Sequence, residues 1–277
     1  MADWKLYCED LLEGAYSLGS SAVDGVNDSS ASGTAPEACD MDHATFWDPT
    51  GTGTQDFLIN LTTARGAKKV AAIGFANAKA MSGLTVTVYS STLWNTATTV
   101  RGTFTAPSAE TFVATLDEPL AAANYWLIRV AGTSASFKVG DIAPLSESGR
   151  VTLSNIATPE WPIDRPMMDG TVTLPLAGGG WIQQIIGSTR EMLALDGMLL
   201  TGGSASDPYD TLRALFHSTR RFSGGLWVTD DSFTSPGAAH RGVLAPGTGI
   251  SARAIKAGPL YRVQMQILTF GNGVDLT

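Results

Sequence analysis

Short segments that alternate apolar and polar residues, each bounded by turn residues, follow one another between residues 57 and 145. In the stretch FLINL, Phe57, Ile59 and Leu61 fall on one face of an extended chain, and 84–91 (LTVTVYSS) alternates in the same way. Strands that recur at such short spacing indicate an antiparallel sandwich or jelly roll. The segments show no strand–helix–strand alternation, which disfavours a doubly wound parallel sheet.

The other segments of this series complete the predicted sandwich. Residues 69–76 (KVAAIGFA) are almost continuously apolar, as in a strand that is covered on both faces. Further strands are predicted at 110–116 (ETFVATL), 124–132 (NYWLIRVAG) and 136–145 (SFKVGDIAPL). Before them, residues 18–38 are rich in Gly, Ser, Asp, Asn and Pro, and we expect a loop there.

A proline-rich stretch follows the last of these strands, with prolines at 144, 159, 162 and 166. Because proline has no backbone N–H to donate, residues 144–170 are predicted to form an extended connector that packs partly through Trp161. Beyond it, 171–176 and 180–187 are predicted to pair as a hairpin, and 190–200 to form another strand.

One segment, 206–222 (SDPYDTLRALFHSTRRF), carries a clear helical pattern. Asp207 can serve as the N-cap, Pro208 suits the first helical position, and Asp210 falls at the third. One face of this helix is formed at helical spacing by Tyr209, Leu212, Leu215, Phe216 and Thr219.

Strands are predicted after this helix at 226–230 (LWVTD) and 261–270 (YRVQMQILTF). The segment between them is interpreted as a loop that contains Pro236, Gly237, His240 and Pro246. The predicted fold class is therefore mainly β, with an N-terminal antiparallel β-sandwich (jelly roll) and a smaller α+β domain with one clear helix. We divide the chain into a sandwich with an N-terminal arm at 1–148, a connector at 149–170 and the α+β domain at 171–277.

Composition restricts the classes of function. Apolar residues make up 44% of the 277, charged residues 16%, and the net charge is −8. Residues 1–150 hold 16 acidic and 9 basic residues, giving −7, so the acidity lies in the first half and a general nucleic-acid-binding role is disfavoured. Two cysteines, Cys8 and Cys39, give no disulfide framework, and free buried thiols are favoured over one bridge. We find no secretory signal and no transmembrane run, and we expect a soluble chain made in a cytoplasm.

The segment CDMDHATFWDPTGTG (39–53) is the densest group of acidic and aromatic residues. Asp40, Asp42 and Asp48 are weak candidates for a Ca²⁺ site, because closely spaced loop aspartates can aim oxygens at one hard cation. Hydrogen bonds that cap turns are the favoured alternative, so no metal is predicted.

Other chemistry has little support. The three histidines, His43, His217 and His240, are far apart and lack metal-binding spacing. No G-x-S-x-G elbow is present, and Asp230 and Asp231 are adjacent on a predicted strand end, so they point to opposite faces. We predict no catalytic residue, no cofactor and no enzyme activity.

The stretch DHATFWDPTGTGTQDFLINL, followed by KVAAIGFAN and LTVTVYSST, resembles the discoidin-like, galactose-binding-like jelly roll. Asp42, Phe46 and Trp47 carry the match, together with Arg129 on a late strand. The resemblance covers about residues 20–145. Sugar-binding members of that family use aromatic residues at loop tips, and Trp94 in STLWNTATTV is the obvious candidate here, while Trp47 fits the core.

The stretches DPYDTLRALFHSTRRFSGGLWVTDD and YRVQMQILTF resemble minor tail or baseplate proteins of tailed bacteriophages. That resemblance implies a structural subunit of a tail tip, which forms a homo-oligomeric ring in the virion after assembly in the host cytoplasm. Its partners would be other tail proteins, including docked receptor-binding proteins, without nucleic acid or membrane insertion.

Three functions remain open at this point. A virion assembly subunit should be found oligomeric in purified particles, since obligate interfaces bury apolar surface. A carbohydrate-binding module for host-surface glycans should lose binding in Trp94→Ala. An enzyme that hydrolyses cell-wall glycans needs convergent carboxylates with perturbed pKa values, and the sequence offers no convincing pair.

Overall fold

A computed structural model of the chain describes residues 4–12, 18–20, 24–30, 32–40, 45–49, 51, 53–61, 66–117, 119–133, 136–153, 167–168, 171–175, 181–185, 190–217, 225–229, 236–244, 251–254 and 260–269. The strands of the first half are β1 (Trp4–Tyr7), β2 (Gly25–Asp28), β3 (Gly53–Asn60), β4 (Lys68–Lys79), β5 (Thr85–Ser91), β6 (Thr99–Thr105), β7 (Phe112–Thr115), β8 (Ala122–Ala123), β9 (Tyr125–Thr133) and β10 (Lys138–Ser146). Two short 3-10 helices are Ala35–Ala38 and Glu147–Gly149. The later elements are β11 (Arg150–Leu153), β12 (Met167–Met168), β13 (Thr171–Pro175), β14 (Trp181–Ile185), β15 (Arg190–Thr201), α1 (Pro208–His217), β16 (Leu226–Thr229), β17 (Gly237–Leu244), β18 (Ser251–Ala254) and β19 (Leu260–Thr269).

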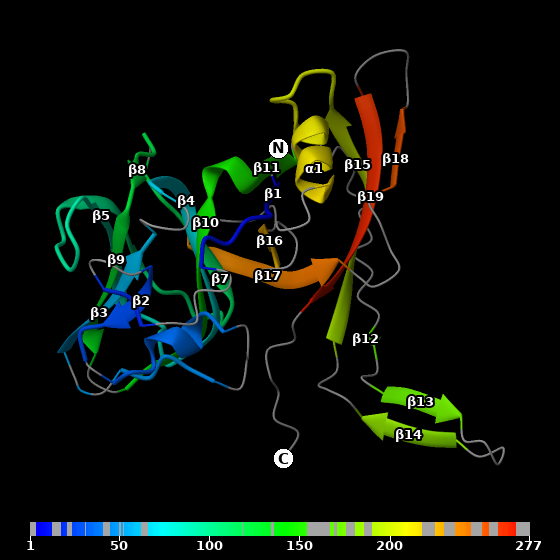
Figure 1. Ribbon diagram of the computed structural model, residues 1–277. Coiled ribbons are helices and arrows are strands. Elements are labelled where there is room, and N and C mark those ends of the chain that lie inside the picture. Colours follow the sequence, from blue (N-terminus) through cyan, green and yellow to red (C-terminus); the bar gives the residue numbers. More distant parts are fainter. Residues whose placement is uncertain are drawn as a thin grey trace.

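Two β-sheets face each other in the first half and form the predicted sandwich (Figure 1). One is five-stranded, in the order β2-β3-β9-β5-β6, and the other is the β10-β4-β7 part of a larger sheet. Their strands pair antiparallel. The inner faces share one apolar core, in which Phe57, Val88 and Ile128 lie with Ile73 and Phe75 of the opposite sheet. The mainly β fold with an antiparallel sandwich is therefore confirmed.

Both faces of β4 are covered, as its continuous apolar sequence predicts. Ile73 and Phe75 belong to the sandwich core, whereas Ala72 lies in a separate cluster with Trp227 of β16. On that outer face Gly74 has no side chain, and a Cβ built there would lie 2.9 Å from the indole ring of Trp227. The indole therefore rests against the backbone of β4, and only a glycine permits this approach.

The strands of the second half extend the same sheet. β17 pairs with β7 at its first residues and then with β16 and β19, so it crosses from the sandwich to the second half (Figure 1). β16 pairs in turn with β1, and β1 pairs with β11. The N-terminal strand thus lies between two strands that follow the sandwich in sequence. The predicted domain boundaries at 148 and 170 stay predictions.

The predicted helix begins where its sequence signals place it. Pro208 is the first residue of α1, and the carbonyl of Asp207 accepts the N–H of Thr211, which fits an N-cap. Leu212 and Leu215 are buried in a second core that includes residues of β1, β16 and β19. Among the residues that the structure describes, no helix is long and apolar enough to cross a membrane.

Other strand predictions after the sandwich are confirmed. β13 and β14 pair as the expected hairpin, and β15, β16 and β19 occupy the segments predicted as strands. In β19 the alternation holds, since Val263, Met265 and Ile267 are buried while Arg262 and Gln264 are not.

Two predicted loops contain strands, and these are corrections. The segment with Gly237 and His240 forms β17, although glycine and alanine disfavour strands, because pairing with β16, β7 and β19 outweighs that propensity. Within 18–38, residues Gly25–Asp28 form β2, which pairs with β3 at the edge of the five-stranded sheet.

The predicted connector also begins differently. Pro144 lies inside β10, opposite Ile73, and β11 occupies residues 150–153. Because β10 ends the order of its sheet, the N–H that proline lacks is not needed by a further strand. Trp161 and the other three prolines lie outside the described residues.

A buried ion pair joins β17 to the outer face of the sandwich. Arg241 Nη1 lies 2.6 Å from Asp141 Oδ2 on β10, and the two side chains are only 1% and 2% exposed. The Arg241 guanidinium also lies 5.4 Å from the ring centre of Trp227. Burial raises the pKa of Asp141 to about 6, and the charge of Arg241 opposes this rise. Arg241, at ion-pair distance, supplies the counter-charge of the Asp141 carboxylate.

We expect Gly74→Ala to destabilise the protein by about 1–3 kcal/mol, because the added methyl group meets the Trp227 ring at overpacking distance. The matched control is Gly102→Ala, whose Cβ would lie 3.4 Å from a flexible leucine methyl and should cost less than about 1 kcal/mol. Urea unfolding measures both free energies. Equal losses in the two variants would contradict the close approach of Trp227.

Arg241→Met should cost about 3–5 kcal/mol at pH 8, because it leaves the Asp141 carboxylate buried without its counter-charge. A carboxyl whose folded-state pKa is raised loses stability as pH rises through that pKa, so the loss should be smaller at pH 5, where Asp141 can take up a proton. Thermal unfolding at both pH values measures this, with the exposed Arg253→Met as control. The same loss at pH 5 and pH 8 would show that Asp141 is not the group left uncompensated.

Candidate functional site

Two of the aspartates considered for Ca²⁺, Asp40 and Asp48, have different side-chain partners. Asp40 Oδ2 accepts a hydrogen bond from Thr45 Oγ1 at 2.8 Å, and Asp48 Oδ2 lies 2.8 Å from Lys138 Nζ. Asp42 lies outside the described residues. Among the residues the structure does describe, no three His, Cys, Asp or Glu side chains are grouped so that they could hold a metal ion. The expectation that these aspartates cap turns and bind no metal stays a prediction.

The aromatic pair Phe46 and Trp47, which lies between Asp42 and Asp48 in the sequence, anchors the segment. Trp47 is fully buried, and its ring centre lies 5.0 Å from that of Phe57 and 5.3 Å from that of Phe137, both in edge-on geometry. Phe46 is half-buried, with Lys79 Nζ 5.0 Å from its ring centre. Trp47 therefore belongs to the core, as the sequence indicates, and is not accessible to a ligand.

Trp94 lies on the loop between β5 and β6, at one end of the five-stranded sheet. The loop is held by its own hydroxyl groups, since Ser91 Oγ accepts the N–H of Leu93 and Thr98 Oγ1 donates to the carbonyl of Ser90. Asn95 has a φ of 54°, in the left-handed region that turns use. The loop sequence STLWNTAT carries no charge. Trp94 is thus presented on a hydrogen-bonded, uncharged turn.

Tyr125, the first residue of β9, supports this turn. Its ring centre lies 5.9 Å from that of Trp94, with the ring planes at 64°. Both side chains are half-buried, and the neighbouring Leu93 is 62% exposed. We call Trp94, Leu93 and Tyr125 the aromatic corner.

The outer face of the five-stranded sheet continues from this corner along β9. Because side chains alternate along a strand, Tyr125, Leu127 and Arg129 share that face, whereas Trp126 and Ile128 belong to the core. Leu127 lies opposite Tyr89 of β5 and opposite Leu58 of β3. Arg129 lies opposite Asp56 and Thr87 in the next outward-facing row.

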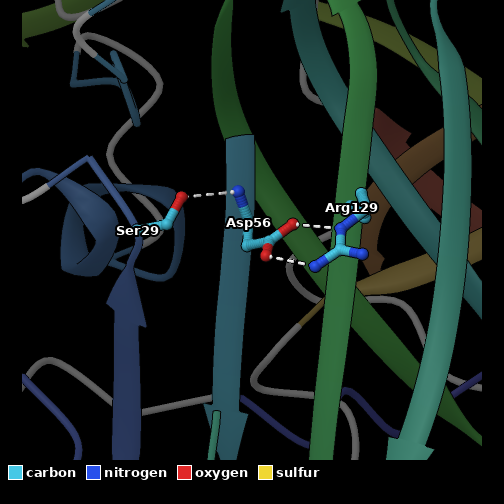
Figure 2. Close-up of polar contacts among 3 residues, drawn as sticks. All are labelled: Ser29, Asp56 and Arg129. Carbon is cyan, nitrogen blue, oxygen red and sulfur yellow. Dashed lines mark hydrogen bonds and ion pairs between the residues drawn. The ribbon is translucent and has the colours of Figure 1, made fainter. Parts of the chain in front are cut away.

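Asp56 and Arg129 form a bidentate ion pair on this face (Figure 2). Arg129 Nε donates to Asp56 Oδ1 at 2.8 Å and Nη2 donates to Oδ2 at 2.7 Å, while the backbone N–H of Asp56 donates to Ser29 Oγ at 2.9 Å. The bond to Asp56 raises the pKa of Arg129 above its ordinary value, so the guanidinium stays charged at every working pH. The Arg129 side chain is 36% exposed, which leaves part of it accessible to a ligand.

Sequence reasoning identifies Trp94 but not the ion pair on the same sheet. Asp56 and Arg129 are separated by 73 residues, and nothing in either local sequence sets the register that places them opposite each other. The one signal in the sequence is alternation, which puts Arg129 and Tyr125 on the polar face of the segment 124–132.

The cysteines and histidines do not form a reactive group in the described part of the chain. Cys8 and Cys39 are both free and buried, as the favoured alternative predicts. Burial raises the pKa of Cys39 well above its ordinary value, and the negative charges of Asp141 and Asp10 add to this, so the thiol is protonated. His217 is exposed at the end of α1, His240 is half-buried on β17, and His43 lies outside the described residues.

Comparison with known proteins gives a likeness in fold. No protein-family model matches the chain, and no curated protein matches it. A chitosan-binding module of a Paenibacillus chitosanase/glucanase is 18% identical, covers 49% of this chain and 97% of its own, and has a TM-score of 0.38. A family 32 carbohydrate-binding module from Clostridium perfringens, solved with galactose, is 16% identical over 44% of this chain and 92% of its own, with a TM-score of 0.36. A fucose-binding module from Streptococcus pneumoniae is 15% identical over 50% of this chain and 96% of its own, with a TM-score of 0.37.

These three similar structures are carbohydrate-binding modules, and none of the three is a phage tail or baseplate protein. At such identities and at TM-scores below 0.5, the likeness carries no argument about the ligand of this chain. The absence of a cofactor and of enzyme activity, which the sequence predicts, stays a prediction.

We expect neither cysteine to react with a thiol reagent in the folded protein, because both are buried and the Cys39 thiol is protonated. Colorimetric titration with Ellman's reagent at pH 8 should detect almost no thiol before unfolding and two thiols per chain in urea. Rapid reaction of one thiol without urea would contradict the burial of that cysteine.

Proposed function

We propose that this protein binds uncharged glycans, and that the aromatic corner of Trp94, Leu93 and Tyr125 is where a sugar rests. The observation that carries this proposal is Trp94 itself, a tryptophan held on a hydrogen-bonded turn beside an exposed leucine. A sugar ring has an apolar C–H face and a polar rim of hydroxyl groups. An aromatic surface with a few polar groups around it suits both parts.

The surroundings of the corner support an uncharged ligand. The turn offers the amide group of Asn95, which can donate to and accept from sugar hydroxyls. The hydroxyl groups of Thr96 and Thr98 donate to the backbone carbonyls of Trp94 and Ser90 and can still accept a hydrogen bond from a sugar. Its sequence contains no charged residue, and the whole chain carries a net charge of −8. A strongly anionic polymer would gain nothing at the corner and would be repelled by the protein as a whole.

Assembly in a phage tail ring, which the second sequence resemblance implies, is the alternative proposal. The observation that favours it is the exposed apolar pair Leu93 and Val100, 62% and 54% exposed, which contact between copies would cover. Light scattering across a range of protein concentrations separates the two proposals. A ring that Leu93→Ser and Val100→Ser together break down would favour assembly, and a monomer at all concentrations would remove it.

The direct test is glycan binding by Trp94→Ala. Galactose and fucose, which are both uncharged, are suitable first probes, since one similar structure is described in complex with galactose and another as a fucose-binding module. Removing an aromatic anchor of an interface costs about 2 kcal/mol or more, so affinity should fall about 30-fold or beyond detection. Trp94→Phe, which keeps an aromatic ring, should retain most of the binding.

The matched control for that test is Phe216→Ala, which removes an aromatic side chain that is 36% exposed on α1, in the second half. Its affinity should equal that of the unaltered protein in isothermal titration. The proposal fails if the unaltered protein binds none of a broad array of neutral glycans, or if Trp94→Ala binds as well as Phe216→Ala.

A further inference from the structure

We propose that the ligand is a linear, uncharged polysaccharide that runs from the aromatic corner across the outer face of the five-stranded sheet to the Asp56–Arg129 pair. This inference rests on the proposed function, because it extends the same binding site. The ligand is then an extended chain and not a single terminal sugar, and no charge is carried along it.

The length of the face fits more than one sugar. Tyr125 and Arg129 are four residues apart on β9, and a strand rises about 3.3 Å per residue, so about 13 Å separates the two ends. Trp94 extends this distance beyond Tyr125 by a ring-to-ring separation of 5.9 Å. One sugar at the corner therefore cannot reach Arg129, but the following units of a chain can.

The middle of this path is apolar. The row between its two ends consists of Leu58, Leu127, Tyr89 and Val100, from four adjacent strands. Leu58 and Leu127 are almost fully buried, whereas Tyr89 is half-buried and Val100 is 54% exposed. A sugar ring can therefore rest its C–H face on Tyr89 and Val100, whereas Leu58 and Leu127 lie below the accessible surface and contact no ligand. A charged group would lose hydration on this apolar part of the path.

The far end of the path supplies hydrogen-bond donors. A guanidinium has five N–H donors, and Arg129 directs one from Nε and one from Nη2 to Asp56. Its carbon atom lies 5.5 Å from the ring centre of Tyr89, so the bond to Asp56 and the ring hold the guanidinium in place. In the same row Thr87 and Thr103 add hydroxyl groups on the two adjoining strands. A sugar at this end meets a fixed set of donors and acceptors.

The charge on the path is balanced. The path crosses two rows of side chains, the apolar row from Leu58 to Val100 and the polar row from Asp56 to Thr103. Asp56 and Arg129 are the charged members of these two rows, and their carboxylate oxygens and guanidinium nitrogens lie 2.7–2.8 Å apart. The pair can therefore bind the hydroxyl groups of a ligand that carries no charge. An uncharged polysaccharide is therefore compatible with this face. In a polysaccharide with a carboxylate on every sugar, one carboxylate would compete with Asp56 for Arg129, and the others would have no positive partner on the path.

The first test measures affinity against chain length by isothermal titration at pH 7. The probes are galactose and linear galacto-oligosaccharides of two to six units, the matched N-acetylglucosamine series, and oligogalacturonates of the same lengths. We expect the hexasaccharide of a neutral series to bind about tenfold or more tightly than its single sugar, and the galacturonates more weakly than the galacto-oligosaccharides. Galacturonate binding equal to or tighter than galactan binding would overturn the assignment of an uncharged ligand.

The second test uses variants at the far end of the path. Arg129→Lys keeps the positive charge but loses the fixed fork of donors, and Thr103→Glu puts a bulky charge on the exposed face. Both should reduce hexasaccharide affinity about fivefold to tenfold, towards that of the disaccharide. Ser108→Glu, in an exposed turn outside the two rows, is the matched control and should bind as the unaltered protein does. Thermal unfolding checks that all three variants are folded.

The outcomes separate this inference from the function on which it rests. If Trp94→Ala abolishes binding but affinity stops rising after the disaccharide, the corner binds sugar and the extended path is wrong. The path is equally wrong if affinity rises with length in Arg129→Lys and Thr103→Glu as it does in Ser108→Glu. If no neutral sugar of any length binds, the proposed function itself is wrong.

Discussion

The approach of the Trp227 ring to the backbone of β4 at Gly74 is the contact on which the rest of the structure depends. A sandwich sheet normally turns its outer face to water, but the outer face of β4 presents Ala72 and Gly74, which are small enough for an indole to rest on them. β16 is thereby held against the sandwich, and Arg241 of β17 reaches Asp141 beside it. If β17 were shifted, both charges would be buried without a partner, which is costly. The ion pair therefore favours this one position of β17 against the sandwich.

This arrangement also determines which surface is left for a ligand. The second half covers the β10-β4-β7 face of the sandwich, and Figure 1 shows the five-stranded sheet on the side away from it. The outer face of that sheet holds both the aromatic corner and the Asp56–Arg129 pair. The candidate site is thus built on strands fixed by the sandwich core, with Ile128 buried behind Arg129, which favours a rigid binding surface.

Several strands of the fold can be predicted from the sequence because their burial pattern is visible within a few neighbouring residues. Alternation in FLINL and LTVTVYSS reports one buried face, and the unbroken apolar run in KVAAIGFA reports two, which is why β4 is expected to be covered on both sides. The strand β17 resembles a loop in sequence because its glycines and alanines have low strand propensity, and its stability comes from neighbours distant in sequence. The same limit applies to the site. Trp94 stands out in its own loop, whereas Asp56 and Arg129 become a pair only through the register of β3 and β9.

The position of β1 has a consequence for how the chain acquires its fold. Lys5 lies opposite Thr229 of β16, 224 residues later in the chain, so this pairing cannot form until nearly the whole polypeptide is present. Closing so long a loop costs entropy before any contact repays it, and strand pairings of this kind form slowly. The sandwich strands pair over much shorter separations and can assemble first. Leu6 and Tyr7, both fully buried at the end, therefore remain uncovered through the earlier stages of folding, which is the period when aggregation through this strand competes with its correct docking.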